Sequence, residues 1–180
     1  MEKIVVINGS NGVGKDLFVS YCDVYCKYLR TIEEKTIIVD NLSTIDPIKE
    51  LAKEIGWDGQ KTDKDRKFLS DLKDLCTDYN NFSFRYITKN IERIRSYNRE
   101  NTIIFIHCRE PKEIQELVDN LEAKTLLILR PQVKVSDNHA DKEVFKYAYD
   151  YSIDNSGTQT DLRTKAEHFI NTLFMIKEKD

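Results

Sequence analysis

A glycine-rich loop directly after a buried apolar segment is the feature that most constrains this chain. Residues 3–8, KIVVIN, are almost uniformly apolar and β-branched, which predicts a strand buried on both faces of a parallel sheet. The next eight residues, GSNGVGKD at positions 9–16, fit the pattern G-x-x-x-x-G-K-[ST] except at its last position, where Asp16 stands. Apolar residues at helical spacing follow from position 17. A strand, a glycine loop and a helix in this order predict a site for phosphate groups.

The residue types of this loop suit a phosphate chain for physical reasons. Glycines let successive backbone N–H groups converge on phosphate oxygens, and the helix that follows adds the positive end of its dipole. Lys15 would reach the outer phosphates, whereas Asp16 would either bind a metal ion directly or repel phosphates when no metal is present. The alternative is a tight strand-to-helix turn without a ligand. The residues expected to bind the nucleotide are Gly9, Asn11, Gly12, Val13, Gly14, Lys15 and Asp16.

The rest of the chain alternates apolar strands with amphipathic helices. Further buried strands are predicted at residues 36–39, 102–106, 125–129 and 151–153, and a closing helix after residue 157. Three apolar stripes at helical spacing separate the second strand from the third. This order predicts a three-layer α/β/α fold with a five-stranded parallel sheet. We expect one domain over residues 1–180, with its core at 1–41 and 100–180, a helical insertion at 42–99 and a short lid at 130–148.

Polar residues follow the predicted strands, where ligands bind in open parallel sheets. They are Asp40, His107, Arg109, Arg130 and Asn155. A guanidinium binds phosphate oxygens two at a time, although Arg109 and Arg130 would also suit pairing with nearby glutamates. A histidine in the place of His107 is more often a hydrogen-bonded structural residue than a catalytic one.

Charge and cysteine content narrow the classes of function. The chain has 180 residues and a formal net charge of -3, yet residues 60–99 hold ten Lys or Arg against six Asp or Glu. This stretch suits either a solvated helix surface or one wall of a cleft for a small anion, whereas a mildly acidic chain argues against nucleic-acid binding. The short apolar runs predict neither a membrane span nor a secretory signal, and a cytoplasmic location is expected. The four cysteines are expected to be reduced, with Cys22 and Cys26 packing on one helix.

Several motifs in order along the chain carry a family resemblance. They are Gly14-Lys15-Asp16, Asp46-Pro47-Ile48-Lys49-Glu50, Trp57-Asp58-Gly59, Arg66-Lys67-Phe68-Leu69, Cys108-Arg109-Glu110-Pro111, His139, and Tyr151-Ser152-Ile153-Asp154-Asn155. The chain resembles the P-loop nucleoside monophosphate kinase group, in particular the phage-type deoxynucleoside monophosphate kinases and their bacterial relatives. Gly-Lys-Asp by itself is also similar to animal phosphomevalonate kinases. The resemblance spans nearly the whole chain.

The resemblance implies an activity and assigns roles. It implies transfer of a phosphoryl group from ATP to a nucleoside or deoxynucleoside monophosphate, with Mg²⁺ as cofactor and small-molecule nucleotides as partners. Lys15, Arg109 and Arg130 would be catalytic, and Asp16 would bind the metal. The adenine would lie near Asn155. The acceptor would lie near Asp46, Lys49, Arg66 and Lys73. A homodimer is compatible with the sequence.

Two positions depart from the family pattern. His107 stands where the pattern has Asp, and Leu17 stands where it has a hydroxyl residue. Both departures remove oxygen ligands that would support a magnesium site. Two alternatives therefore stay open, namely a nucleotide-binding module without kinase activity and a kinase for another phosphorylated small molecule such as phosphomevalonate.

Overall fold

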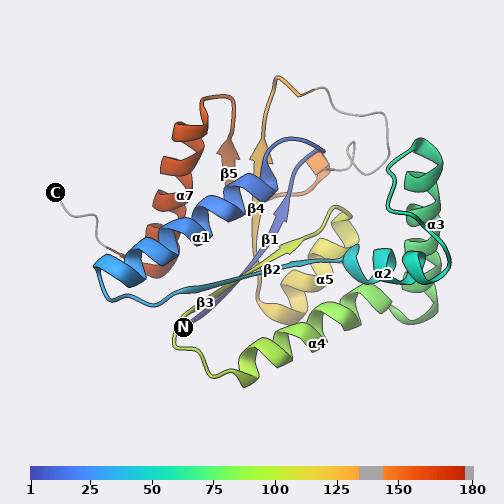
Figure 1. Ribbon diagram of the computed structural model, residues 1–180, viewed down its shortest axis with the longest axis horizontal. Helices are drawn as coiled ribbons and strands as arrows, with labels where there is room; N and C mark the ends of the chain where they lie inside the picture. The colour runs from blue at the N-terminus through green and yellow to red at the C-terminus, as the bar shows by residue number, and fades with distance from the viewer. Residues whose placement is uncertain (134–143, 177–180) are drawn as a thin grey trace. The chain divides into compact units, whose positions relative to one another are not determined.

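A five-stranded sheet forms the centre of the computed structural model, which describes residues 1–133 and 144–176. The strands are β1 (Glu2–Asn8), β2 (Ile38–Ser43), β3 (Thr102–His107), β4 (Lys124–Leu129) and β5 (Tyr151–Asp154), in the order β2-β3-β1-β4-β5. β1 pairs in parallel with β3 and β4, and β4 pairs in parallel with β5 (Figure 1). The predicted α/β class with a five-stranded parallel sheet is confirmed.

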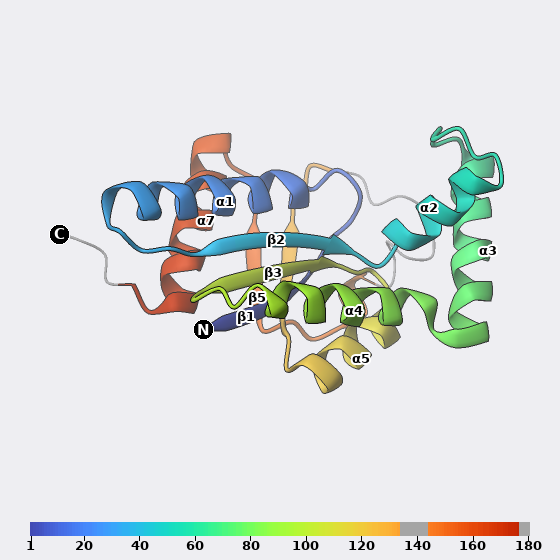
Figure 2. The ribbon, with the colours of Figure 1, turned by 60° about the horizontal axis from the view of Figure 1, so that its bottom comes forward.

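Helices cover both faces of this sheet. α1 (Lys15–Ile32) and α7 (Gln159–Phe174) pack beside each other on one face, and α5 (Pro111–Leu121) lies on the other (Figures 1 and 2). Because strand side chains alternate between faces, Val5 and Ile7 of β1 and Ile103 and Phe105 of β3 join the core beneath α1 and α7. Phe18 of α1 contacts Phe105 and Phe169 edge to face, with ring centroids 6.5 and 5.6 Å apart. On the opposite face, Ile114 and Leu117 bury the apolar side of α5.

Residues Leu42–Asn98 form a second compact unit, and Met1–Asn41 with Arg99–Asp180 form the first. The second unit holds α2 (Asp46–Glu54), α3 (Asp63–Asn80) and α4 (Phe82–Ser96), which are the three helices predicted from the apolar stripes. A capping box in which Thr62 and Asp65 exchange hydrogen bonds begins α3. No helix in the described part of the chain is long and apolar enough to span a bilayer.

The structure corrects two details. The second strand was predicted as a buried strand at 36–39, but β2 begins at Ile38, ends at Ser43 and is half-buried over most of its length. It lies at the edge of the sheet, so polar residues are tolerated within it. Asp40 therefore lies inside the strand rather than after it, and its carboxylate accepts a hydrogen bond of 2.6 Å from Arg99.

The second correction concerns burial along two helices. The apolar stripe of α3 is present, but none of its side chains is buried, and Leu75 and Tyr79 are 67% and 83% exposed. On α1, Leu17 and Tyr28 from the predicted apolar series are also exposed. Hydrophobic periodicity thus predicted the helices correctly and overestimated what they bury. Of the predicted lid at 130–148, residues 134–143 lie outside the described residues, and His139 is among them.

Candidate phosphate-binding site

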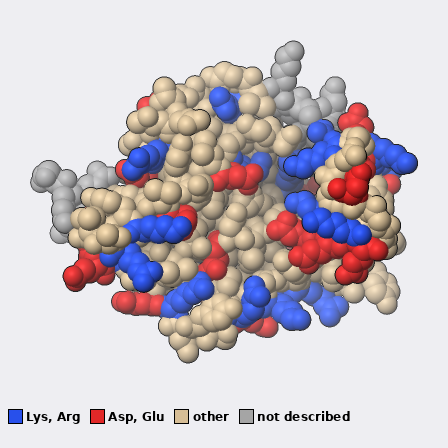
Figure 3. Space-filling model, in the orientation of Figure 1, with Lys and Arg blue, Asp and Glu red and all other residues tan. Residues whose placement is uncertain are grey.

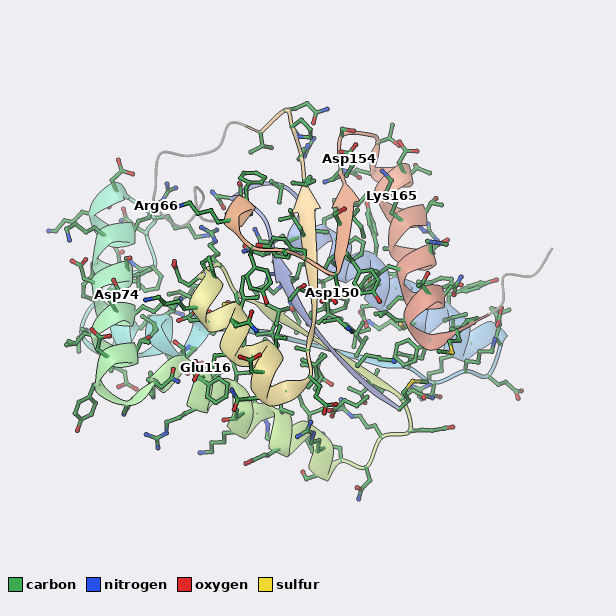
Figure 4. All side chains as sticks on the ribbon, turned by 180° about the vertical axis from the view of Figure 1, so that it is seen from behind. Arg66, Asp74, Glu116, Asp150, Asp154 and Lys165 are labelled. Atoms are coloured by element: carbon green, nitrogen blue, oxygen red, sulfur yellow. The ribbon has the colours of Figure 1, made fainter. Side chains whose placement is uncertain are left out.

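The loops after β1, β3, β4 and β5 all leave the sheet at the carboxyl ends of these parallel strands, which we call the carboxyl edge. In the register of the parallel pairs, Ile7 lies beside His107, Asn8 beside Leu127, and Leu129 beside Asp154. Figure 4 marks this edge by Asp154 at the end of β5, where Lys165 of α7 donates a hydrogen bond of 2.6 Å to the Asp154 carbonyl. β1 lies between β3 and β4, so the strand order reverses on either side of it. Ligands of open α/β sheets bind at such a reversal, and here the glycine loop occupies it.

Three glycines of the loop have positive φ angles, 143° at Gly9, 79° at Gly12 and 97° at Gly14. A Cβ atom at Gly9 would lie 2.5 Å from the carbonyl oxygen of Ile128 on β4. A Cβ atom at Gly14 would lie 2.5 Å from Nδ2 of Asn155. The loop therefore needs glycine for two reasons, its left-handed backbone and its close packing against the ends of β4 and β5.

The start of α1 supports anion binding. Gly14 is the N-cap residue, and in the described structure no side chain caps this end of the helix. The first N–H groups of a helix lack partners within the helix, so here they can donate hydrogen bonds to a ligand. The first turn also carries Asp16, whose side chain is 96% exposed.

Lys15 lies over the loop that precedes it. Its Nζ donates hydrogen bonds of 2.6 Å to the carbonyl of Gly9 and 2.9 Å to that of Ser10. The side chain is half-buried, so the ammonium group is held against the loop. A positive charge is thereby fixed beside backbone N–H groups, as a binding site for a triphosphate requires.

Asn155 follows β5 and fastens the loop. Its Nδ2 donates a hydrogen bond of 2.7 Å to the carbonyl of Val13, and its side chain is buried. Its backbone N–H donates to the carbonyl of Leu129. The family resemblance implies that Asn155 lies near the adenine, which stays a prediction. The structure shows that Asn155 links β4, β5 and the glycine loop.

A magnesium ion at this site would rely on few protein ligands. Asp16 supplies a carboxylate, and its Oδ1 lies 3.7 Å from Nε2 of His107. Mg²⁺ prefers oxygen ligands and usually keeps several waters, with one or two carboxylates and the substrate phosphates completing its shell. Over residues 1–133 and 144–176, no group of three or more His, Cys, Asp or Glu is placed to hold a metal. Asp16 therefore fits magnesium only together with phosphate oxygens and water.

The two arginines occupy different surroundings. Arg109 follows β3 and is half-buried, and its carbonyl accepts a hydrogen bond of 3.2 Å from Nδ2 of Asn8. Arg130 follows β4 and is exposed, and its carbonyl accepts a hydrogen bond from the N–H of Val133 in a turn. Both residues follow the carboxyl ends of their strands, on the side of the sheet that carries the glycine loop, as predicted.

Asn8 and Tyr149 belong to the site but were not predicted from the sequence. Asn8 is fully buried at the end of β1, where its Oδ1 accepts a hydrogen bond of 2.7 Å from the N–H of Gly9. Its Nδ2 donates to the hydroxyl of Tyr149 at 2.7 Å. The available signal was a polar residue at the end of an apolar strand, directly before a glycine.

The four residues predicted near an acceptor all belong to the second unit. On α2, Nζ of Lys49 lies 3.2 Å from a carboxylate oxygen of Asp46. Arg66 lies exposed near the start of α3, and Lys73 is half-buried further along it. Figure 3 shows side chains of both signs interspersed where α3 lies, and this helix carries four basic and five acidic residues. The basic excess of residues 60–99 therefore does not lie on α3, and α4 carries four basic residues against one acidic.

Cys22 and Cys26 behave as packing residues. Cys22 and Cys26 lie buried one turn apart on α1. Burial, with the neighbouring Cys26, raises the pKa of Cys22 well above its usual range, and burial with Asp23 raises the pKa of Cys26 to about 12. Protonated thiols are poor nucleophiles and poor metal ligands, so these two side chains contribute to the core.

Comparison with known proteins finds likeness in structure only. No family model and no curated protein matches the sequence. Shikimate kinase from Acinetobacter baumannii, solved in complex with shikimate, is 9% identical over 99% of this chain and 97% of that one, with a TM-score of 0.45. Shikimate kinase from Bacteroides thetaiotaomicron is 14% identical over 97% and 99%, with a TM-score of 0.43. Shikimate kinase from Aquifex aeolicus is 11% identical over 96% of this chain and 98% of that one, with a TM-score of 0.46. The likeness to these three enzymes concerns the fold alone.

Proposed function

We propose that this chain is a kinase that transfers the γ-phosphoryl group of ATP to a nucleoside or deoxynucleoside monophosphate, with Mg²⁺ as cofactor. The observation that carries the proposal is the glycine loop, which places Lys15 and the start of α1 at the point where the strand order reverses. Resemblance of the ordered motifs to nucleoside monophosphate kinases supports the choice of acceptor. The proposal includes that, within this group, the chain is similar to the phage-type deoxynucleoside monophosphate kinases.

The reaction needs positioning rather than covalent chemistry from the protein. An oxygen of the acceptor phosphate attacks the γ-phosphorus, the bond to the β,γ-bridging oxygen breaks, and ADP and a nucleoside diphosphate leave. Magnesium, when bound, neutralises charge on the phosphate oxygens. The N–H groups of Gly12, Val13 and Gly14 would hold the phosphates, and Lys15 would stabilise charge on the outer ones. Arg109 and Arg130 would offset the repulsion between donor and acceptor.

The acceptor residues are proposed on the resemblance alone. Asp46, Lys49, Arg66 and Lys73 would bind the monophosphate and its nucleoside. A phosphate already carries an ionised oxygen at neutral pH, so no general base is required of these side chains. Cations near the acceptor would serve to bring two anions together.

A nucleotide-binding module without turnover is the second candidate. The observation that favours it is the sparse metal site, where Asp16 is 96% exposed and His107 stands at the position of an expected carboxylate. Leu17, at the position of an expected hydroxyl, is also exposed. Such a site would still hold a nucleotide through its backbone N–H groups and Lys15.

Two measurements on one preparation separate these candidates. Calorimetry with Mg-ATP measures binding, and a coupled assay for ADP release measures transfer to each common ribo- and deoxynucleoside monophosphate. Binding with transfer to one or more of them supports the kinase. Binding without transfer to any of them, even when phosphomevalonate and shikimate are added to the panel, supports the module. Absence of binding to both Mg-ATP and Mg-GTP would overturn both.

A further inference from the structure

Asn8 is a junction of three segments. It ends β1, and its amide binds the first N–H of the glycine loop, the carbonyl of Arg109 after β3 and the hydroxyl of Tyr149 before β5. Its oxygen accepts one hydrogen bond and its two amide hydrogens serve two acceptors. The side chain is fully buried, so these contacts replace water.

Tyr149 completes the hydrogen bonding of this amide, whose orientation also depends on the N–H of Gly9 and the carbonyl of Arg109. Its hydroxyl accepts from Nδ2 of Asn8 at 2.7 Å and donates to the carbonyl of Val144 at 2.9 Å. An amide flipped by 180° would turn NH₂ toward the N–H of Gly9, so two donors would face each other. Burial raises the pKa of Tyr149 to about 12, against a smaller opposing effect of its bond to Asn8. The hydroxyl therefore remains a donor throughout the neutral range.

The contact continues into the phosphate site. Asn8 Oδ1 holds the N–H of Gly9, and the carbonyl of the same Gly9 accepts the 2.6 Å hydrogen bond from Lys15. The backbone of Arg109 is held by the same amide. A shift of Asn8 would therefore move both the ammonium group of Lys15 and the segment that carries Arg109.

We propose that Tyr149 is a positioning residue for phosphoryl transfer, which acts through Asn8 on the glycine loop and Arg109. The inference rests on the proposed function. Misplacing reacting groups by about 1 Å costs on the order of 10²-fold in rate, so a modest displacement of the loop has a measurable effect. No role for Tyr149 beyond this contact is required.

The test uses two tyrosines that lose the same atom. Tyr149→Phe removes the hydroxyl bound to Asn8. The matched control, Tyr147→Phe, removes a hydroxyl that donates a 3.0 Å hydrogen bond to Gln115 of α5, away from the loop. The two rings contact each other edge to face at 5.3 Å, so both variants keep this packing. We expect kcat/KM for ATP to fall about tenfold or more in Tyr149→Phe and to stay within twofold of wild type in Tyr147→Phe.

Stability and coupling separate positioning from a general loss of structure. Urea unfolding should show a larger loss of stability for Tyr149→Phe, which loses two part-buried hydrogen bonds, than for Tyr147→Phe, which loses one exposed hydrogen bond, and it checks that both variants are folded under the conditions of the assay. In an Asn8→Ala background, Tyr149→Phe should cause no further loss of kcat/KM, since the residue through which it acts is gone. If Asn8→Ala does not fold, the comparison of the two tyrosine variants decides alone.

The outcomes that contradict the inference differ from those that contradict the proposed function. An active wild type with equal kcat/KM in Tyr149→Phe and Tyr147→Phe overturns the positioning role and leaves the kinase intact. An additive loss in the Asn8→Ala background shows that Tyr149 does not act through Asn8, and overturns it likewise. A wild type that binds no Mg-ATP overturns the proposed function and the inference with it.

Discussion

At the carboxyl ends of the strands, Asn8 and Asn155 are buried, both polar atoms of the Asn8 amide take part in hydrogen bonds, and Nδ2 of Asn155 donates to the carbonyl of Val13. Along α3, all of whose residues the structure describes, no side chain is buried. Its stabilising contacts include the Thr62–Asp65 capping box, the ion pair between Lys67 and Asp71 at 2.6 Å, and half-buried side chains packed against α2 and α4. Buried hydrogen bonds are thus found where charge must be positioned, whereas α3 is held by exposed and half-buried contacts.

The largest expected effect tests whether phosphoryl transfer takes place at the glycine loop, at the carboxyl ends of the strands. Lys15→Ala should lower kcat by on the order of 10³-fold, because it removes the charge beside the transferred phosphoryl group. Lys27→Ala removes a 74% exposed ammonium from the same helix and serves as the control. A coupled assay measures both, and thermal unfolding checks that each variant folds. Unchanged turnover in Lys15→Ala would show that the loop is only a turn.

Two leucines test the difference in burial between the regions. Leu29 of α1 is fully buried, whereas Leu75 of α3 is 67% exposed. Truncation of a buried leucine to alanine costs about 2–5 kcal/mol, because transfer energy is lost and a cavity remains. We expect that loss for Leu29→Ala and a change within about 0.5 kcal/mol for Leu75→Ala, measured by urea unfolding. Comparable losses would mean that α3 buries this residue in solution, and the comparison would need revision.

Two glycines separate backbone strain from close packing. Gly14 and Gly59 have φ angles of 97° and 88°, but nothing lies within 4 Å of a Cβ atom built at Gly59, whereas Asn155 lies 2.5 Å from one at Gly14. Gly59→Ala should cost about 1–2 kcal/mol from the left-handed backbone alone. Gly14→Ala should cost about 1–3 kcal/mol more, because Asn155 must leave the Val13 carbonyl. Equal unfolding free energies for the two variants would show that Asn155 yields without loss.

How far the sequence predicts this molecule follows from the range of the forces involved. The strand, loop and helix around Gly14 and Lys15 were predictable because local patterns specify them, and so were the helices of residues 42–98. Burial of α3 was not predictable, since periodicity reports which side chains share a face and not what covers it. Asn8 and Tyr149 are 141 residues apart, and no local pattern indicates their contact. The position of Asp40 inside β2 likewise depends on strand pairing.

The smallest expected effect concerns pH. Partial burial opposes ionisation of Asp150, but hydrogen bonds from the backbone and hydroxyl of Thr125, with Lys124 nearby, hold the pKa of Asp150 below its ordinary value. Asp150 lies at the opposite end of β5 from Asp154 (Figure 4).

Because the pKa of Asp150 is depressed in the folded protein, the stabilisation is present above the unfolded pKa of about 3.9 and is lost as pH falls through the folded value. Asp150→Asn should therefore destabilise the protein at pH 6 by less than about 1 kcal/mol, and the difference from wild type should shrink toward pH 3. Asp74→Asn, an exposed change on α3, is the control, and urea unfolding at pH 6, 4 and 3 measures both. A difference for Asp150→Asn that stays constant over this range would show that the contact with Thr125 depends on geometry and not on charge.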